Sequence, residues 1–236
     1  MQLPKRHNAT ITSKEWISSK VLEVKFKVQD SFEFVPGQFI SLNVAENTYR
    51  AYSICSDYKI VDEFTIVADA KHEGMGSNFL REKNIGDTVS FIGPSGRFVF
   101  SPNIPKNVVF LATGTGIAPF IPMFHKLQDM ESKSKITVYF GLKHEDHIFY
   151  EGILNNFKAQ MHSFDYKLTV SKPTPNWTGL RGRIFEHLDI SDVPNTCVYL
   201  CGNPEMVEQG VELLTNKGFQ KDQIHLEKFT FAVVQK

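Results

Sequence analysis

The chain has 236 residues, and its hydrophobic fraction of 42% is enough to bury a core in one large domain or two modest ones. Lysine plus arginine number 26, as do aspartate plus glutamate, so no overall charge attracts nucleic acid or an anionic membrane, and no apolar run reaches the roughly 18 residues of a membrane span. The cysteines Cys55, Cys197 and Cys201 lack CxxC spacing, which argues against a disulfide framework, a zinc site and an iron-sulfur cluster. Since no apolar leader follows Met1 either, these features predict a cytoplasmic protein without metal.

The first hundred residues predict an antiparallel barrel. In residues 20–30, Leu22, Val24 and Phe26 alternate with charged residues, as in a half-buried strand. Turn signals such as Gly93-Pro94 separate this run from similar runs at residues 37–44, 49–55, 63–70 and 87–93. Short strands at this spacing favour a Greek-key barrel, with one helix expected at residues 77–84.

After about residue 103 the pattern changes to strands that alternate with helices. Residues 108–113 form a continuous apolar run, as a parallel strand buried on both faces does, and residues 119–130 then show a helical pattern. The alternation continues with strands expected at 135–141, 165–170 and 196–202, and with helices expected at 149–160, 184–188 and 204–218. This half of the chain predicts a doubly wound α/β sheet.

Two glycine turns follow strands of this second half. Gly114 and Gly116 lie in the sequence GTGIAP between a strand and a helix, where a missing Cβ allows a tight turn and a helix N-terminus suits a phosphate. Cys201-Gly202 ends the last predicted strand, and Pro204 can open the next helix at its first turn. Because ligands bind at the carboxyl ends of such strands, the two turns are expected to lie together. Taken alone, each also fits a plain strand-to-helix turn, and Cys201 fits simple core filling.

Two segments of the first half carry phosphate-binding chemistry. A strand at RAYS places Arg50 and Tyr52 on one face and Ser53 on the other. The guanidinium can bind a phosphate bidentately, the Tyr52 ring can stack, and the short hydroxyl can hydrogen-bond. The sequence GMGSNFL suggests that Ser77 caps a short helix whose N-terminus suits an anion. The alternatives are an ordinary strand and a flexible turn, and closeness of this turn to Arg50 would decide between them.

These segments, together with Glu227-Lys228-Phe229, resemble the ferredoxin:NADP reductase superfamily. Members of that family have an R-x-Y-S/T strand, a G-x-x-S/T turn, G-T-G-x-x-P, C-G-x-P and an acidic-aromatic pair near the C-terminus, and this sequence matches all five in order. The resemblance covers nearly the whole chain. It implies a flavin-binding barrel domain at residues 1–103 and a nicotinamide-binding α/β domain at residues 104–236.

The resemblance implies roles for individual residues of the barrel. Arg50 is expected to pair with the flavin phosphate, Tyr52 to stack on the isoalloxazine ring, and Ser53 to hydrogen-bond near the flavin N5. Further flavin contacts are expected from Ala51, Ile66, Val67, Gly74, Gly76, Ser77 and Asn78. The expected cofactor is FAD, with FMN as the alternative.

The resemblance also implies a nicotinamide site. Thr115 and Gly116 are expected to meet the nucleotide phosphates, and Cys201 is expected beside the nicotinamide C4, facing Ser53 across the stacked rings. Further contacts are expected from Gly114, Pro119, Ser171, Lys172, Gly202, Asn203 and Pro204. Lys172 offers charge to a 2′-phosphate without a bidentate fork, whereas the W-x-G-x-x-G that follows it looks more like NADH-using reductases. Both NADH and NADPH therefore remain candidates for the bound nucleotide.

Three further features lie near these motifs. Glu227 stands at the position of the family's acidic residue and is expected to move protons or orient Ser53. Phe229 is expected to shield the flavin ring, unless the tail at 230–236 reaches the adenine instead. His144 and His147 lack a third metal ligand, so their segment is expected to be a solvated loop.

The resemblance implies hydride transfer between NAD(P)H and FAD, and then electron transfer to a separate acceptor, first of all ferredoxin or flavodoxin. A local basic surface for such an acidic partner is expected from Lys5, Arg6, Arg81 and Lys83. The alternatives are a reductase component of an oxygenase or another electron-transfer complex, a free-flavin reductase and, in a different class, a non-catalytic flavin-binding or nucleotide-binding subunit. The oligomeric state is left open.

Overall fold

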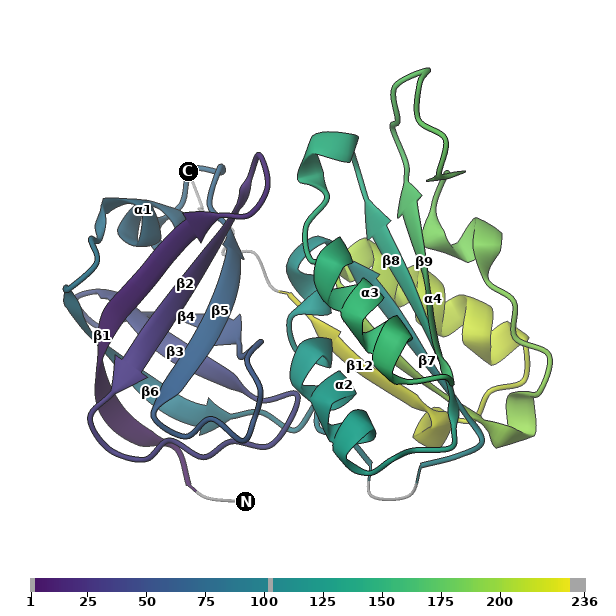
Figure 1. The fold of residues 1–236 in the computed structure, drawn as a ribbon, viewed down its shortest axis with the longest axis horizontal. Coiled ribbons are helices and arrows are strands. Elements are labelled where there is room, and N and C mark those ends of the chain that lie inside the picture. The colour runs from purple at the N-terminus through teal and green to yellow at the C-terminus, as the bar shows by residue number, and fades with distance from the viewer. Residues whose placement is uncertain (1–2, 102–103, 230–236) are drawn as a thin grey trace. The chain divides into compact units, whose positions relative to one another are not determined.

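A computed structural model of the chain describes residues 3–101 and 104–229. The chain forms two compact units, which we call the barrel unit and the sheet unit (Figure 1). The barrel unit comprises Met1–Pro102, Ala118–Ser132 and Asp146–Phe157, and the sheet unit comprises Asn103–Ile117, Lys133–Glu145 and Lys158–Lys236. Among the helices of the described residues, none is long and apolar enough to cross a membrane.

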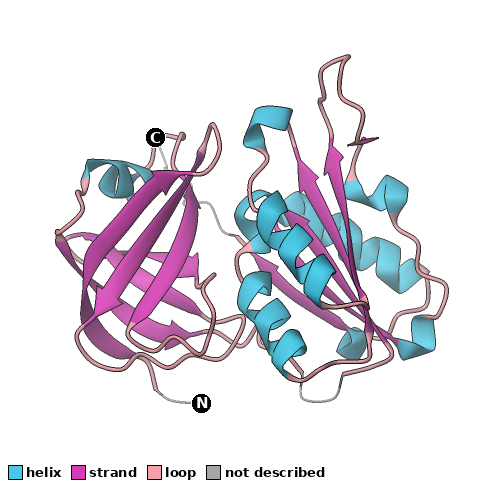
Figure 2. Cartoon of the chain, viewed as in Figure 1, coloured by secondary structure: helices cyan, strands magenta, loops and turns pink. Residues whose placement is uncertain are grey.

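The barrel unit contains six antiparallel strands in the order β4-β3-β6-β1-β2-β5 (Figure 2). Their bounds are β1 Lys5–Trp16, β2 Val21–Val28, β3 Phe39–Ala45, β4 Thr48–Ser53, β5 Glu63–Asp69 and β6 Thr88–Ser95. A single antiparallel bridge between Ile54 and Ile66 connects the β4 and β5 sides of the sheet. The predicted antiparallel Greek-key barrel is thereby confirmed, because β6 returns to lie between β3 and β1.

The core of the barrel follows the alternation that the sequence predicts. Leu22, Val24 and Phe26 of β2 are buried, while the residues between them are partly exposed. Strand β1 was not predicted, because only Ala9 and Ile11 of its twelve residues are buried and the apolar period is weak. Helix α1 (Met75–Glu82) confirms the predicted helix of the barrel, although it begins two residues earlier than expected.

Helices α2 (Phe120–Asp129) and α3 (Glu151–Gln160) also occur as predicted, and α2 and residues 151–157 of α3 belong to the barrel unit by their contacts. The residue before α3, Tyr150, has a positive φ of 60° and reaches two barrel residues. Its hydroxyl donates a short hydrogen bond to the Glu23 carboxylate and lies 3.4 Å from the Cys55 sulfur. Burial raises the pKa of the Tyr150 phenol, so the hydroxyl stays protonated and donates its hydrogen bond to the Glu23 carboxylate.

Tyr150→Phe is therefore expected to lower the free energy of unfolding by about 1–3 kcal/mol, since it leaves a partly buried carboxylate without its donor. Urea unfolding followed by circular dichroism measures the change. Tyr49→Phe is the matched control, because the Tyr49 hydroxyl accepts an exposed bond from Arg6. Equal losses in the two variants would contradict a special role for the Tyr150 contact.

The sheet unit contains six strands in the order β10-β9-β8-β7-β11-β12, and all neighbours are parallel. The bounds are β7 Asn107–Thr113, β8 Lys135–Leu142, β9 Phe164–Val170, β10 Leu180–Arg181, β11 Thr196–Gly202 and β12 Ile224–Lys228. The chain enters at β7, winds outward through β8, β9 and β10, and then crosses to β11. The predicted doubly wound sheet is confirmed, and β7 and β11 flank the point where the strand order reverses.

Helix α4 (Pro204–Asn216) packs its buried Met206, Val207 and Leu214 in one core with Val198 and Leu200 of β11. One prediction in this unit is wrong: residues 184–188 form only a short 3-10 turn, Ile184–His187. Ile184 is the only buried residue of that turn, so no continuous apolar face supports a longer helix. The short strands β10 and β12 were not predicted, because neither contains a fully buried residue.

Candidate functional site

The RAYS strand and the turn before α1 meet in the barrel unit. Arg50 and Tyr52 lie on β4, and Gly76 lies in the first turn of α1. A Cβ on Gly76 would stand 2.4 Å from the Tyr52 hydroxyl and 3.2 Å from Cγ of Arg50. The turn therefore lies close to Arg50, which favours a binding turn over a flexible one, and a side chain at position 76 would displace Tyr52.

The N-terminus of α1 faces this contact without a side-chain cap. Gly74 is the N-cap residue, so the amides of the first turn have no helical acceptor and are suited to an anion. The prediction that Ser77 caps the helix is wrong, because α1 begins at Met75 and Ser77 already lies inside it. The Ser77 hydroxyl instead donates to the Asp69 carbonyl oxygen at 3.0 Å. Asn78 follows in the same turn, with its amide on the Gly74 carbonyl.

The chemistry of the strand residues suits a planar, anionic ligand. Burial raises the pKa of Tyr52 to about 12, and the Arg50 charge opposes this only in part, so the phenol stays neutral. One guanidinium nitrogen of Arg50 donates to the Tyr49 carbonyl at 2.9 Å, which leaves further donors of the fork for a ligand. Ser53, at the end of β4, is buried, and Ala51 is exposed. Ile66 and Val67 are buried in β5.

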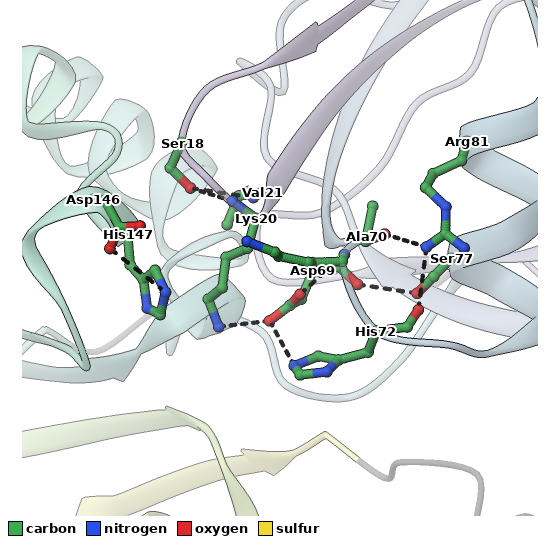
Figure 3. A network of polar contacts seen from close by, with 11 residues as sticks. Ser18, Lys20, Val21, Asp69, Ala70, His72, Ser77, Arg81, Asp146 and His147 are labelled. Atoms are coloured by element: carbon green, nitrogen blue, oxygen red, sulfur yellow. Dashed lines mark hydrogen bonds and ion pairs between the residues drawn. The ribbon is translucent and has the colours of Figure 1, made fainter.

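Polar contacts surround the turn between β5 and α1 (Figure 3). Lys20 pairs with the Asp69 carboxylate at 2.6 Å, and Arg81 binds backbone carbonyls of this turn. The expected basic surface of Lys5, Arg6, Arg81 and Lys83 is not formed as one cluster. Lys5 and Arg6 begin β1, whereas Lys14 near the end of the same strand binds the carbonyls of Arg81 and Lys83. At about 3.3 Å per strand residue, the two pairs of cations lie on the order of 25 Å apart.

The two glycine turns of the sheet unit touch through their backbones. Gly114–Ile117 forms a 3-10 turn after β7, and a Cβ on Gly116 would stand 2.2 Å from the Cys201 carbonyl oxygen. Gly202 has a φ of +142°, and a Cβ there would stand 2.4 Å from the Thr113 hydroxyl. The predicted closeness of the two turns is confirmed. They lie at the carboxyl ends of β7 and β11, where the strand order reverses and where ligands of such sheets bind.

Helix α4 begins beside these turns. Pro204 occupies its first turn, as predicted, and the Asn203 side chain accepts a bond from the Glu205 amide at 2.8 Å. The Asn203 amide donates to the Thr113 hydroxyl at 3.2 Å, which holds the second turn to the first strand. Thr115 is partly exposed in the first turn, and Pro119 is buried at the N-cap of α2.

Cys201 and Glu227 lie side by side on neighbouring strands, β11 and β12. The Cys201 thiol is fully buried, and burial raises its pKa well above the usual range, with the Glu227 charge adding to the effect. The thiol is therefore neutral in this structure and is not a proton acceptor. The Phe229 amide donates to the Gly202 carbonyl at 3.2 Å, and the tail at 230–236 lies outside the described residues.

All three cysteines are expected to resist thiol reagents in the folded protein. Cys55, Cys197 and Cys201 are buried and unpaired, and burial raises the pKa of Cys55 and of Cys197 to about 12. An aromatic disulfide reagent at pH 8 is expected to leave the native thiols unmodified for hours and to modify all of them in guanidinium. Rapid reaction of one native thiol, located by peptide mass mapping, would contradict the burial.

The loops after β8 and β9 are tied together. The amides of Ser171 and Lys172 donate to the carbonyls of Leu142 and Lys143. His144 Nδ1 lies 3.1 Å from the Lys172 carbonyl oxygen. Within residues 3–101 and 104–229, no group of three His, Cys, Asp or Glu side chains is placed to hold a metal ion.

Sequence reasoning missed Glu145 in this region. Its carboxylate accepts bonds from the Thr174 amide at 2.7 Å and from the Thr174 hydroxyl at 2.9 Å. The contact joins residues 29 positions apart, and no motif in the sequence marks it.

Two described protein families match successive parts of the chain. The family of oxidoreductase FAD-binding domains matches residues 8–100, and the family of oxidoreductase NAD-binding domains matches residues 110–211. The chain is thus built from a flavin-binding and a nicotinamide-binding domain. It belongs to the ferredoxin reductase-like flavoprotein superfamily, and its cofactors are FAD and NAD(P)H.

Relatives of this superfamily differ in length and in described role. The chain is 27% identical over 201 residues to the anthranilate 1,2-dioxygenase electron transfer component of Acinetobacter baylyi, covering 84% of this chain but only 58% of that protein. It is 28% identical over 227 residues to ferredoxin–NADP reductase B of Sorangium cellulosum, covering 90% of this chain and 93% of that one. The structure of the Amycolatopsis cytochrome P450 reductase GcoB superposes with a TM-score of 0.90 at 22% identity, over 97% of this chain and 71% of that chain, which shows a shared fold.

Proposed function

We propose that the chain transfers a hydride between NAD(P)H and bound FAD and passes the electrons to a separate acceptor. The observation that carries the proposal is the contact of Gly76 with Tyr52 and Arg50, which brings a helix N-terminus, a cation and an aromatic ring together. The glycine turns at the strand reversal of the sheet unit supply a second nucleotide site. We assign the two domains to residues 1–103 and 104–236, and the reduced, buried cysteines support a cytoplasmic location.

The residues of the barrel fit a flavin nucleotide. When bound, FAD supplies the hydride acceptor and the ability to release electrons one at a time. In the proposed site Arg50 and the first-turn amides of Gly76 and Ser77 bind the phosphate, while the Asn78 amide, bonded to the Gly74 carbonyl, closes the first turn of α1. Tyr52 packs its neutral ring against the isoalloxazine, and Ser53 holds a hydrogen bond near N5.

The residues of the sheet unit fit the nicotinamide nucleotide. Thr115 and Gly116 place backbone amides toward its phosphates, and the backbone contact between Gly116 and Cys201 keeps that turn in place. We propose that Cys201 packs beside the nicotinamide as a neutral group, and that Glu227 acts in proton transfer or orientation rather than as a nucleophile. Little acid-base chemistry is needed from the protein, whose task is to position the rings and exclude water.

The acceptor we propose first is a ferredoxin or flavodoxin, since a relative of similar length carries the name ferredoxin–NADP reductase. The second candidate is an oxygenase system, supported by the relative described as a dioxygenase electron transfer component, of which this chain spans 58%. Free-flavin reduction and a non-catalytic flavin-binding subunit are the remaining alternatives.

Stopped-flow spectroscopy tests the proposal. The purified protein with FAD is mixed anaerobically with NADH or NADPH, and bleaching of the flavin bands is followed. The reduced protein is then offered ferredoxin, flavodoxin, free flavin and an oxygenase component in separate experiments. Bleaching by either nucleotide supports the enzyme, and the acceptor that reoxidises it fastest identifies the partner. Absence of flavin bands after incubation with FAD or FMN would exclude both cofactor binding and catalysis.

A further inference from the structure

The loop after β5 and the first two residues of α1, residues 70–76, are here called the 70–76 turn, and hydrogen bonds to its backbone hold it in shape. The Asp69 carbonyl before it accepts the Ser77 hydroxyl at 3.0 Å. The carbonyls of Ala70 and His72 both accept bonds from the same guanidinium nitrogen of Arg81, the first of them short and the second at 3.3 Å. Figure 3 shows Arg81 and Ser77 reaching these carbonyl groups from α1.

The planar guanidinium of Arg81 forms a set of hydrogen bonds that a lysine side chain cannot reproduce. While Nη1 binds the two carbonyls, Nη2 donates to the Asn78 side chain at 2.6 Å, one helical turn earlier. The guanidinium therefore connects the last turn of α1 with its first turn and with the chain that enters it. Its ion pair with Glu73, at 3.7 Å, adds little, because the Glu73 side chain is 88% exposed.

The 70–76 turn and the C-terminal end of α1 are each bonded to other parts of the barrel. Lys20, in the hairpin after β1, pairs with the Asp69 carboxylate, and its own carbonyl accepts the Ala70 amide at 2.9 Å. Lys14 of β1 binds the carbonyls of Arg81 and Lys83 at the C-terminal end of α1. Both the turn and the helix are thus fixed to strands, and Arg81 spans the distance between them.

We propose that Arg81, supported by Ser77, is a positioning residue that holds the 70–76 turn in the shape that binds the FAD phosphates. Arg81 itself makes no contact with FAD, and its role rests on the proposed flavin site. Gly76 and the first-turn amides lie at the end of the turn that Arg81 secures, and a Cβ on Gly76 would already collide with Tyr52. A small shift of this turn therefore moves the phosphate-binding amides away from Arg50, but it leaves the ring-binding face of Tyr52 in place.

The test compares two flavins, of which only one carries phosphate. Apo-protein is titrated with FAD and with riboflavin, and dissociation constants are obtained from flavin fluorescence for wild type, Arg81→Met, Arg81→Lys and Lys83→Met. Arg81→Met is expected to weaken FAD at least about tenfold while riboflavin changes by less than about twofold. Arg81→Lys is expected to recover only part of the loss, because lysine keeps the charge without the fork. Lys83→Met, at the same end of α1, controls for loss of a positive charge and is expected to bind FAD like wild type.

Two outcomes would overturn the inference: unchanged FAD affinity in Arg81→Met, or equal weakening of FAD and riboflavin, which would indicate general loss of structure. If Arg81→Met fails to fold by circular dichroism, Ser77→Ala replaces it, and a FAD-specific loss in that variant is again required. If the wild-type protein bound no FAD, the proposed function itself would be refuted. If the wild type bound FAD and Arg81→Met bound it equally well, the role of Arg81 alone would be refuted.

Discussion

Gly116→Ala is expected to lower the rate of flavin reduction by NAD(P)H about 100-fold or more while leaving FAD bound. The new Cβ would stand 2.2 Å from the Cys201 carbonyl oxygen and 2.7 Å from Cα of Gly202. Both neighbours are backbone atoms of a fully buried strand, so they cannot turn aside as a flexible side chain would. The turn that carries Thr115 must move, and overpacking of this kind destabilises by about 1–3 kcal/mol.

The measurement combines three readouts on one preparation: stopped-flow bleaching by NADH, FAD content, and thermal unfolding. Gly218→Ala is the matched control, since a Cβ there meets nothing within 4 Å and only the positive φ of 94° is unfavourable. We expect this control to lose about 1 kcal/mol of stability, from backbone conformation alone, and to keep most of its reduction rate. A Gly116→Ala protein that is reduced as fast as wild type would refute the nucleotide role of the turn.

Much of this fold could be predicted because its strongest signals are local. The alternation of Leu22, Val24 and Phe26 marks a barrel strand, and the continuous apolar run at 108–113 marks a strand buried on both faces. Gly116 and Gly202, one in each nucleotide turn, occur where a Cβ has no room, so their positions in the sequence already carried information about contacts. The order of the motifs along the chain then made the flavin and nicotinamide sites recognisable.

The features that escaped prediction depend on tertiary partners. Strand β1 is mostly polar, and it forms because both neighbouring strands supply its hydrogen bonds. Arg81 was interpreted as a surface cation, yet its partners are backbone carbonyls, which no side-chain pattern reveals. The start of α1 at Met75 placed Ser77 inside the helix, because the extended backbone of Gly74 provides the N-cap in its place. Backbone acceptors of this kind are common in proteins and leave no trace in the composition of the chain.

Ser53→Ala is expected to slow hydride transfer to the bound flavin about 100-fold to 1,000-fold while FAD affinity stays near that of wild type. Ser53 is only 5% exposed and ends β4 directly after Tyr52, so its hydroxyl is held by the strand rather than by a mobile loop. A fixed donor or acceptor near the reacting nitrogen needs no reorganisation when charge changes there, which is why its removal affects the rate more than binding.

The comparison is between Ser53→Ala, Ser53→Thr and Ser41→Ala, each loaded with FAD and mixed anaerobically with NADH. Threonine keeps the hydroxyl and is expected to restore most of the rate, whereas a purely structural role would make the bulkier threonine the worse substitution at a buried position. Ser41 lies on the neighbouring strand β3 opposite Ala51, and its loss is expected to leave the rate unchanged. If Ser53→Ala reduced its flavin at the wild-type rate, the hydroxyl would have no part in the transfer. The flavin site would then act through Arg50, Tyr52 and the helix N-terminus alone.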